Sequence, residues 1–194
     1  MNKLTRADLL PLEAYAQRRA DMRAEILARK KARQVAIGGN VTLIFEDRHT
    51  VQYQIQEMLR AERIFEPEGI QCELDAYNPL IPDGDNWKAT MLLEYPDPAV
   101  RARELALLRG VEDCVWMRAG TLPRLTAIAD EDLDRSNETK TSAVHFLRFQ
   151  FPPQVLEAIR SGAPVGFGID HDHFRAACDP VPEAIRAALA ADLD

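Results

Sequence analysis

The chain has 194 residues, of which 46% are hydrophobic and 28% are charged. This composition is typical of a folded globular protein and excludes a long disordered tract. The apolar runs, such as residues 41–45 and 91–93, fall far short of the roughly 18 residues that a membrane-spanning helix needs. Because the amino terminus also lacks the apolar stretch of a secretory signal, we expect a cytoplasmic protein with no membrane association.

The net charge of −7 is unevenly distributed along the sequence. Residues 1–33 hold nine Lys and Arg against four Asp and Glu, a charge of +5 that leaves −12 for the remainder. Acidic residues interrupt this basic segment and no aromatic pattern supports base stacking, so nucleic-acid binding is not expected. We expect the segment to pack on an acidic surface of the same chain or of a second subunit.

Three cysteines, Cys72, Cys114 and Cys178, are widely spaced and form no C-x-x-C pair. The odd number and the spacing indicate neither a disulfide framework nor an iron-sulfur or zinc site with cysteine ligands. We expect three reduced thiols that pack as small apolar groups.

The amino-terminal segment is predicted to be helical. A short turn capped by Thr5 precedes a long helix over residues 12–33. Its apolar residues form a thin stripe, which suits docking on the domain surface or on a second subunit. Gly38 and Gly39 end the element, because glycine tolerates the left-handed backbone that closes a helix.

A strand and a second helix are predicted next. Residues 41–45 alternate as a short strand. Asp47 can accept hydrogen bonds from the first turn of a helix that reaches about residue 64. Pro67 and Gly69 are expected to stop this helix.

From about residue 72 onwards, short segments rich in β-branched and aromatic residues are punctuated by Pro and Gly. They predict strands at 89–95, 113–118, 125–130, 143–151 and 164–170. Helices are predicted at 98–109, 153–160 and 182–193. The sequence therefore predicts an α+β fold with a mainly antiparallel sheet of about five or six strands, flanked by helices and preceded by a long amino-terminal helix.

We expect a single domain over residues 1–194, in which residues 1–33 form a helical arm and residues 40–194 form the α+β core. The apolar side of each predicted element indicates which residues are buried. These residues are Leu43, Phe45, Val51, Ile55, Leu59, Leu92, Val144, Phe146 and Ile169.

Three long segments resemble a known family. They are EDRHTVQYQIQEMLRAERI (46–64), ELDAYNPLIPDGDNWKATMLLEYPD (73–97) and TKTSAVHFLRFQF (139–151). Together they resemble an uncharacterised bacterial domain-of-unknown-function family of roughly this length, and the likeness extends over residues 5–175. Its members are often encoded near rubrerythrin-like and iron-sulfur-protein genes, so the resemblance implies redox or oxidative-stress physiology. It supplies no mechanism and no catalytic residues.

The segment GIDHDHF at 168–174 is a candidate metal site. His171 and His173 would project from the same face of a continuing strand, and two imidazoles at that spacing can bind one divalent ion. His145 from a neighbouring strand would be a third ligand. A carboxylate would come from Asp170, Asp172 or Asp179. The alternative is a polar turn at a strand end, with hydrogen-bonded or solvated imidazoles.

Glu46 and His49 form an E-x-x-H pair, an arrangement that ferritin-like di-iron proteins place on their helices. That architecture requires two such pairs and two further glutamates on four helices, whereas this sequence has a single copy. We therefore interpret the pair as the solvent-facing start of a helix.

Residues 75–88 are predicted to form a loop dense in hydrogen-bonding and aromatic groups. Such loops often carry binding function on a rigid scaffold. Together with the following sheet, the loop would form a pocket for an anionic small molecule. The candidate ligand-binding residues are Tyr77, Asn78, Asp83, Trp87, Lys88, Lys140 and Arg148, with His145 as a further donor. The alternative is that Trp87 and Tyr77 pin an irregular connection onto the core.

The sequence contains no G-x-G-x-x-G, P-loop, G-x-S-x-G or H-E-x-x-H motif, which disfavours nucleotide-binding folds and the common hydrolases. Our first hypothesis is a non-enzymatic accessory or small-ligand-binding protein in a redox or oxidative-stress pathway. A homodimer and redox-pathway proteins are its expected partners. The alternative hypothesis is a metal-dependent enzyme centred on His145, His171 and His173. A divalent metal is the single cofactor that the residues suggest.

Overall fold

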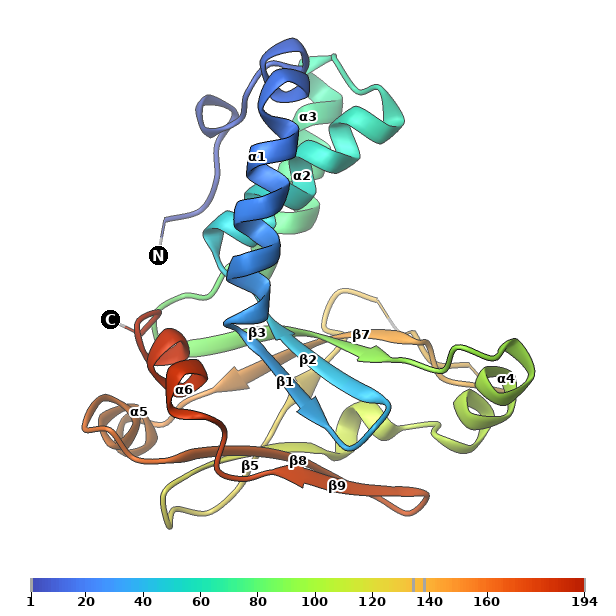
Figure 1. The fold of residues 1–194 in the computed structure, drawn as a ribbon, viewed down its shortest axis with the longest axis vertical. Helices are drawn as coiled ribbons and strands as arrows, with labels where there is room; N and C mark the ends of the chain where they lie inside the picture. Colours follow the sequence, from blue (N-terminus) through green and yellow to red (C-terminus); the bar gives the residue numbers. More distant parts are fainter. Residues whose placement is uncertain (1, 134, 138, 194) are drawn as a thin grey trace.

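The computed structural model describes residues 2–133, 135–137 and 139–193. A group of helices forms one end of the molecule, and two sheets form the other (Figure 1). The helical end consists of α1 (Leu12–Lys31), α2 (Arg48–Glu62), α3 (Pro67–Tyr77) and the short 3₁₀ helices η1 (Arg6–Asp8) and η2 (Asn78–Leu80). The prediction of an α+β fold with a long amino-terminal helix and antiparallel strands is confirmed.

Within the described ranges, the strands form two antiparallel sheets rather than one. The first, in the order β1-β2-β3-β7-β6, consists of β1 (Gln34–Ile37), β2 (Val41–Phe45), β3 (Asn86–Leu93), β7 (Val144–Gln150) and β6 (Ile128–Ala129). The second, in the order β5-β4-β8-β9, consists of β5 (Leu125–Thr126), β4 (Val115–Ala119), β8 (Val165–His171) and β9 (Phe174–Cys178). The remaining helices are α4 (Pro98–Leu107), η3 (Val111–Cys114), α5 (Pro153–Arg160) and α6 (Glu183–Ala190).

Large aromatic side chains fill the space between the two sheets. Phe45 on β2 and Phe167 on β8 have ring centroids 4.9 Å apart, so they join the sheets directly. Phe149 on β7 lies 5.5 Å from Phe167. Trp87 on β3 belongs to the same cluster, and its Nε1 donates to the Leu189 carbonyl oxygen over 2.9 Å. Its one polar atom is therefore satisfied on burial.

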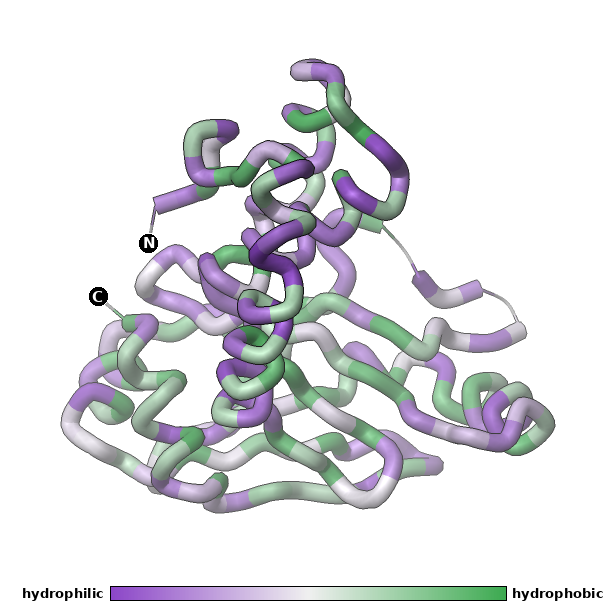
Figure 2. Tube along the Cα trace, turned by 45° about the horizontal axis from the view of Figure 1, so that its top comes forward, coloured by the Kyte–Doolittle hydropathy of each residue, from purple (hydrophilic) through white to green (hydrophobic). Residues whose placement is uncertain are grey.

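The amino-terminal helices enclose a second, smaller hydrophobic cluster. Its buried members are Leu4, Val51, Ile55, Leu59, Leu74 and Ile81. Helix α1 buries Tyr15 and Ile26, and hydrophilic residues recur along its length (Figure 2). The thin apolar stripe predicted for this helix is therefore present. Across the part of the chain that the structure describes, no helix combines the length and the apolar character that a membrane span requires.

Polar contacts supplement the narrow apolar face of α1. Tyr15 Oη donates to Glu57 on α2 over 2.5 Å. Arg19 donates from Nε and Nη2 to the two carboxylate oxygens of Glu57, each over 2.7 Å. A bidentate pair of this kind fixes orientation more than a single contact does.

Acid titration is expected to weaken this contact between α1 and α2. Arg19 lowers the pKa of the Glu57 carboxyl from 4.5 to about 2. Because the folded-state pKa is depressed, the stabilisation is complete above pH 4.5 and is lost as the pH falls through about 2. The Glu57→Gln variant should lose less stability than the wild type over this interval, although solvent screening makes the difference modest. Thermal unfolding followed by circular dichroism measures it, and equal acid sensitivity would contradict the assignment.

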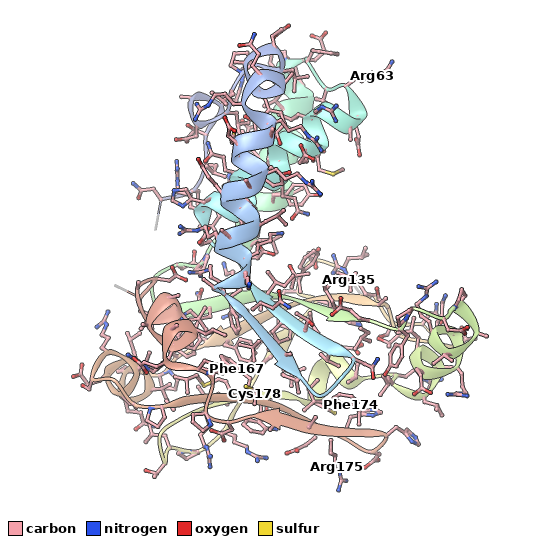
Figure 3. The ribbon with its side chains drawn as sticks, in the orientation of Figure 1. Arg63, Arg135, Phe167, Phe174, Arg175 and Cys178 are labelled. Atoms are coloured by element: carbon pink, nitrogen blue, oxygen red, sulfur yellow. The ribbon has the colours of Figure 1, made fainter. Side chains whose placement is uncertain are left out.

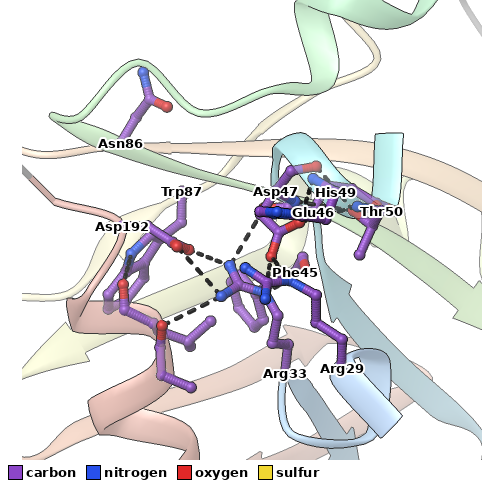
Figure 4. A network of polar contacts seen from close by, with 12 residues as sticks. Arg29, Arg33, Phe45, Glu46, Asp47, His49, Thr50, Asn86, Trp87 and Asp192 are labelled. Carbon is purple, nitrogen blue, oxygen red and sulfur yellow. Dashed lines mark hydrogen bonds and ion pairs between the residues drawn. The ribbon is translucent and has the colours of Figure 1, made fainter. Parts of the chain in front are cut away.

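A buried ionic network fixes the junction between the helices and the sheets (Figure 4). The Arg33 side chain, which is 4% exposed, forms ion pairs with Asp47 and Asp192. Asp47 also caps α2, as predicted, because its carboxylate accepts from the backbone N–H groups of His49 and Thr50 over 2.8 and 2.9 Å. Since Asp192 follows α6, the network ties the carboxyl-terminal segment to the amino-terminal helices.

The structure differs from the sequence expectation around Pro67. Pro67 does not merely end the preceding helix but occupies the first position of α3, where its missing N–H costs nothing. Gly69 consequently lies inside α3 and is not a stop. The segment 75–88 is therefore no continuous loop, because it contains the end of α3, then η2, and finally the start of β3. Strands β1 and β9 are also additional to the predicted ones.

Most of the predicted core residues are buried, namely Leu43, Phe45, Val51, Ile55, Leu59 and Ile169. The prediction is wrong for three others: Leu92 and Phe146 are half-buried, and Val144 is 38% exposed. On β7 the buried positions alternate in the opposite phase, so that His145 and Leu147 are buried instead. A histidine occupies a core-facing position there. Hydrophobicity alone therefore assigns the buried and exposed faces of this strand incorrectly.

Candidate functional site

A cleft of about 610 Å³ lies between the helical end of the molecule and the first sheet. Its floor is the face of β3 and β7 that points away from the second sheet, and the carboxyl-terminal end of α3 with η2 forms another wall. Leu80 and Phe146 supply apolar walls, whereas Lys88 and Arg148 supply positive charge. Glu131, which follows β6, closes one side. Small-molecule sites in proteins have this size and this mixture of apolar and polar groups.

Basic side chains converge in the cleft. Lys88 and Arg148 lie directly opposite each other on β3 and β7. Lys88 Nζ and Lys3 Nζ both donate to the Asp83 carboxylate, over 2.7 and 2.6 Å, so two ammonium groups share one anion. Arg148 donates from Nε and Nη2 to the two oxygens of Glu131, each over 2.7 Å. Three cations and two carboxylates therefore meet here, and two further carboxylates, Asp75 and Asp132, also line the cleft.

The pKa values reflect this crowding. Burial lowers the pKa of Lys88, and the neighbouring charges of Lys3 and Arg148 lower it further, while Asp83 opposes them. Burial alone would raise the pKa of Asp83, but its lysine partners outweigh this and hold it well below its usual range. The hydrogen bond from Arg148 lowers the pKa of Glu131. Burial is thus the main cause of the lowered pKa of Lys88, and its ion pair with Asp83 offsets this only in part.

The structure gathers part of the predicted ligand-binding set in the cleft, namely Asp83, Lys88 and Arg148. Tyr77 packs against the helical hydrophobic cluster. The Asn78 side-chain amide accepts from the Leu4 N–H over 2.7 Å and donates to the Leu4 carbonyl oxygen over 2.9 Å. Trp87 faces the core between the sheets, and Lys140 is exposed and does not line the cleft. Three of these four side chains therefore hold the fold together around the cleft.

A buried polar cluster surrounds His145, next to the cleft. His145 is fully buried, and its Nδ1 lies 2.6 Å from Asp130 Oδ2. Its Nε2 lies 2.9 Å from Thr141 Oγ1, 3.1 Å from the Ser142 carbonyl oxygen and 3.8 Å from Glu112 Oε2. Potential ligand atoms of Glu112, Asp130 and His145 all lie within 4.8 Å of one another. This is the spacing at which side chains can share one metal ion.

Segments far apart in the sequence supply this cluster. Glu112 belongs to η3, Asp130 follows β6, and His145 is on β7. Asp130 has a left-handed backbone with φ 46°, and it accepts from the Phe146 N–H through Oδ1 over 2.9 Å. Arg135, which lies beside the first sheet (Figure 3), donates to Asp130 over 3.2 Å. Its guanidinium carbon is 4.5 Å from the centroid of the Phe146 ring. Because Phe146 also lines the cleft, the cluster and the cleft share a wall.

The other two histidines of the predicted metal site lie apart from His145. His171 ends β8, and His173 is in the turn that follows. Both ring nitrogens of His171 are engaged, Nε2 with the Arg109 carbonyl oxygen over 3.1 Å and Nδ1 with the His173 N–H over 3.2 Å. The three carboxylates that were candidates for a further metal ligand all form ion pairs with arginines. The pairs are Asp170–Arg124, Asp179–Arg118 and Asp172–Arg175.

The E-x-x-H pair is also separated. Glu46 is buried and accepts from the hydroxyl groups of Thr50 and Thr90, over 2.5 and 2.7 Å. His49 is exposed at the start of α2. The interpretation of a solvent-facing pair is therefore wrong for Glu46, because β3 covers this carboxylate.

Sequence reasoning does not identify Glu112, Asp130 or Thr141 as site residues. No local spacing connects them, because the pairing of β6 with β7 and the position of η3 bring them together. One signal was present in the sequence. His145 interrupts a run of apolar residues in a predicted strand, and a core-facing histidine needs buried hydrogen-bond partners.

These features define an α+β protein with a cleft of ligand size beside a buried histidine and carboxylate cluster. The chain belongs to the family described as Protein of unknown function (DUF3501), which matches residues 3–193. It is similar to a novel protein of unknown function from Burkholderia pseudomallei, known from a crystal structure, with 48% identity, a TM-score of 0.94 and 100% coverage of both chains. No curated protein matches it. The resemblance to an uncharacterised domain family is confirmed.

Proposed function

We propose that the chain binds a small organic anion in the cleft between α3 and the first sheet. The observation that carries this proposal is the position of Lys88 and Arg148, directly opposite each other on neighbouring strands. Like charges placed directly opposite destabilise a sheet unless another charge compensates them. Lys3 adds a third cation next to Lys88. Asp83 and Glu131 supply this compensation in the structure, and an incoming anion would replace Glu131 as the partner of Arg148.

The two cations have different roles in this proposal. The planar guanidinium of Arg148 fits a carboxylate or phosphate group through two parallel hydrogen bonds, which it now makes to Glu131. Glu131 is half exposed, so an incoming anion can take its place at little cost in burial. Lys88 adds a point charge, and its side chain is 12% exposed. Phe146 and Leu80 supply apolar surface for the body of the ligand.

Replacement of Arg148 by glutamine is expected to weaken anion binding by about tenfold to a hundredfold, because a hydrogen bond to a charged group contributes roughly 1.5–3 kcal/mol. Isothermal titration with citrate, succinate and glycerol 3-phosphate as probes measures the change. Arg175→Gln is the matched control, since Arg175 is 71% exposed on β9 and lies outside the cleft. Equal affinity in wild type and Arg148→Gln, or saturable binding of none of the probes, would reject the anion site.

We further propose that this binding serves a non-enzymatic accessory role in a redox or oxidative-stress pathway, with redox-pathway proteins as partners. The gene neighbourhood that the family resemblance implies supports this setting. The free thiols of Cys72, Cys114 and Cys178 are compatible with a reducing cytoplasm.

We also propose a single domain that forms a homodimer through α1. The ion pair between Arg33 and Asp192 supports the single domain, because it ties the helical arm to the carboxyl-terminal segment of the core. Leu27 supports the homodimer, because this apolar side chain on α1 is 55% exposed.

A further inference from the structure

Among the described residues, the hydrogen bonds of His145 place Nδ1 against an acceptor and give Nε2 a single possible donor, the Thr141 hydroxyl. A neutral imidazole carries one N–H, which donates, and one bare nitrogen, which accepts. Nδ1 faces a carboxylate oxygen of Asp130 at 2.6 Å, and this contact requires the hydrogen on Nδ1. Nε2 then points a lone pair at the carbonyl oxygen of Ser142, 3.1 Å away, and this oxygen can only accept.

The remaining neighbours of Nε2 are oxygens as well. Glu112 Oε2 lies 3.8 Å from Nε2. The Thr141 hydroxyl lies 2.9 Å from Nε2 and 3.1 Å from Glu112 Oε2, and its one hydrogen can satisfy either of these acceptors but not both. Ser136 donates its hydroxyl to the other oxygen of Glu112. A nitrogen lone pair, a carboxylate and a carbonyl oxygen therefore converge in a buried place, and a cation between them would satisfy all three.

The charges of the cluster match a divalent ion. Two carboxylates, Glu112 and Asp130, face one imidazole, and their side chains are 10% and 9% exposed. Arg135 lies 3.2 Å from Asp130, but it binds Asp132 more closely, through two hydrogen bonds of 2.6 and 2.7 Å. Arg135 therefore compensates the charge of Asp130 only in part.

Asp130 is not itself a ligand in this arrangement. Its oxygen and His145 Nδ1 are 2.6 Å apart, which is a hydrogen-bond distance and too short for two ligands on one ion with bonds of about 2.0–2.2 Å. Nε2 and Glu112 Oε2, at 3.8 Å, are suitably spaced for such bonds. Asp130 instead fixes the tautomer of His145, as carboxylates behind metal-bound histidines commonly do.

We propose that His145 Nε2 and the Glu112 carboxylate bind a divalent first-row transition metal ion, with Asp130 as the carboxylate that orients the histidine. The Ser142 carbonyl oxygen and the Thr141 hydroxyl are available to complete the coordination. One nitrogen and several oxygens suit zinc, manganese or iron(II) better than a thiolate-seeking ion. This site is separate from the anion cleft and its test is independent of ligand binding there.

Untagged protein stripped with EDTA should bind one equivalent of Zn²⁺, Mn²⁺ or Co²⁺ per chain in isothermal titration, and Co²⁺ should give a visible absorption band. Glu112→Gln keeps the size of the side chain and removes its charge, so its dissociation constant should rise at least tenfold. Asp130→Asn should weaken binding by about 10-fold to 100-fold, the usual effect of losing a carboxylate behind a metal ligand. Circular dichroism of each metal-free variant checks that it is folded.

The double variant His171→Ala, His173→Ala is the matched control, because these two histidines are outside the buried cluster. It should retain the wild-type affinity and stoichiometry. Loss of binding in this control, with full binding in Glu112→Gln and Asp130→Asn, would overturn the proposal in favour of a surface site. Absence of saturable binding of all three ions to folded wild-type protein would overturn it as well.

Discussion

Replacement of Arg33 by methionine is expected to lower the free energy of unfolding by about 3–5 kcal/mol, the usual cost of breaking a buried ion pair from one side. The Arg33 side chain is 4% exposed, and it donates to the carbonyl oxygens of Phe45, Glu46 and Ala188 besides its two ion pairs. Its removal leaves Asp192, 7% exposed, without its ionic partner. Urea denaturation followed by tryptophan fluorescence measures the loss.

Two comparisons show whether Arg33→Met loses stability because a charge is left unpaired or because packing is lost. The double variant Arg33→Met, Asp192→Asn should be more stable than Arg33→Met alone, because it removes the unpaired carboxylate. Burial raises the pKa of Asp192 already in the wild type. A raised folded-state pKa means that lowering the pH neutralises this carboxyl at small cost, so the deficit of Arg33→Met should shrink in acid. A loss below 1 kcal/mol that does not change with pH would show that the network does not hold the two ends of the chain together.

Local signals were sufficient to predict much of the fold. Asp47 precedes an amphipathic run with Val51, Ile55 and Leu59 on one side, and the structure places this carboxylate at the cap and these side chains in the core. Pro153 marks the first turn of α5 as expected. In these segments, capping and hydrophobic periodicity indicate the same structure, so no tertiary information was needed.

Pro67 shows where a local signal is ambiguous. A proline followed by a glycine two residues later disfavours a continued helix, but proline also suits the first turn of a new one. The structure has the second arrangement, with α2 ending at a left-handed Arg63 and α3 beginning at Pro67. Because the helix starts there, Tyr77 and Asn78 became parts of the scaffold instead of a binding loop.

Strand β7 shows a different limit. Val144 and Phe146 are apolar, yet they face outward, since the outer face of this sheet is itself partly covered by α3 and the segment after β6. His145 is polar, yet it faces the core, where Asp130 and Thr141 lie within hydrogen-bond distance of its two ring nitrogens. Hydrophobicity cannot assign the two faces of a strand when one side is a lined cleft and the other contains a polar cluster.

The cleft could be predicted from the sequence more readily than the cluster around His145. Lys88 and Arg148 lie in segments that are rich in binding groups, and both residues were predicted to belong to one ligand-binding pocket, so their meeting was within reach. Glu112 stands in a short 3₁₀ helix that has no sequence motif of its own. Its approach to His145 depends on how η3 packs against β6 and β8, which is a property of the assembled core.

The aromatic cluster between the sheets is the feature on which both sites depend, because it fixes the relative position of β3, β7 and β8. Phe167 is at its centre, fully buried, with ring centroids at 4.9 Å from Phe45, 5.5 Å from Phe149 and 6.0 Å from Trp87. On the opposite face of the same strand, Gly168 leaves room for the Trp116 indole, since a Cβ there would lie 2.2 Å from it. Strand β8 is thus packed closely on both sides.

Replacement of Phe167 by alanine is therefore expected to cost about 3–5 kcal/mol, the transfer free energy of the ring together with the cavity that it leaves. The surrounding rings come from two sheets that are themselves hydrogen-bonded, so they cannot move together to fill the space. Phe65→Ala is the matched control: this side chain is 64% exposed, and its loss should change the stability by no more than about 0.5 kcal/mol. Urea denaturation of both variants measures the difference. Similar losses in the two would show that the sheets are not held together by this ring, because a central position and a surface position would then contribute equally.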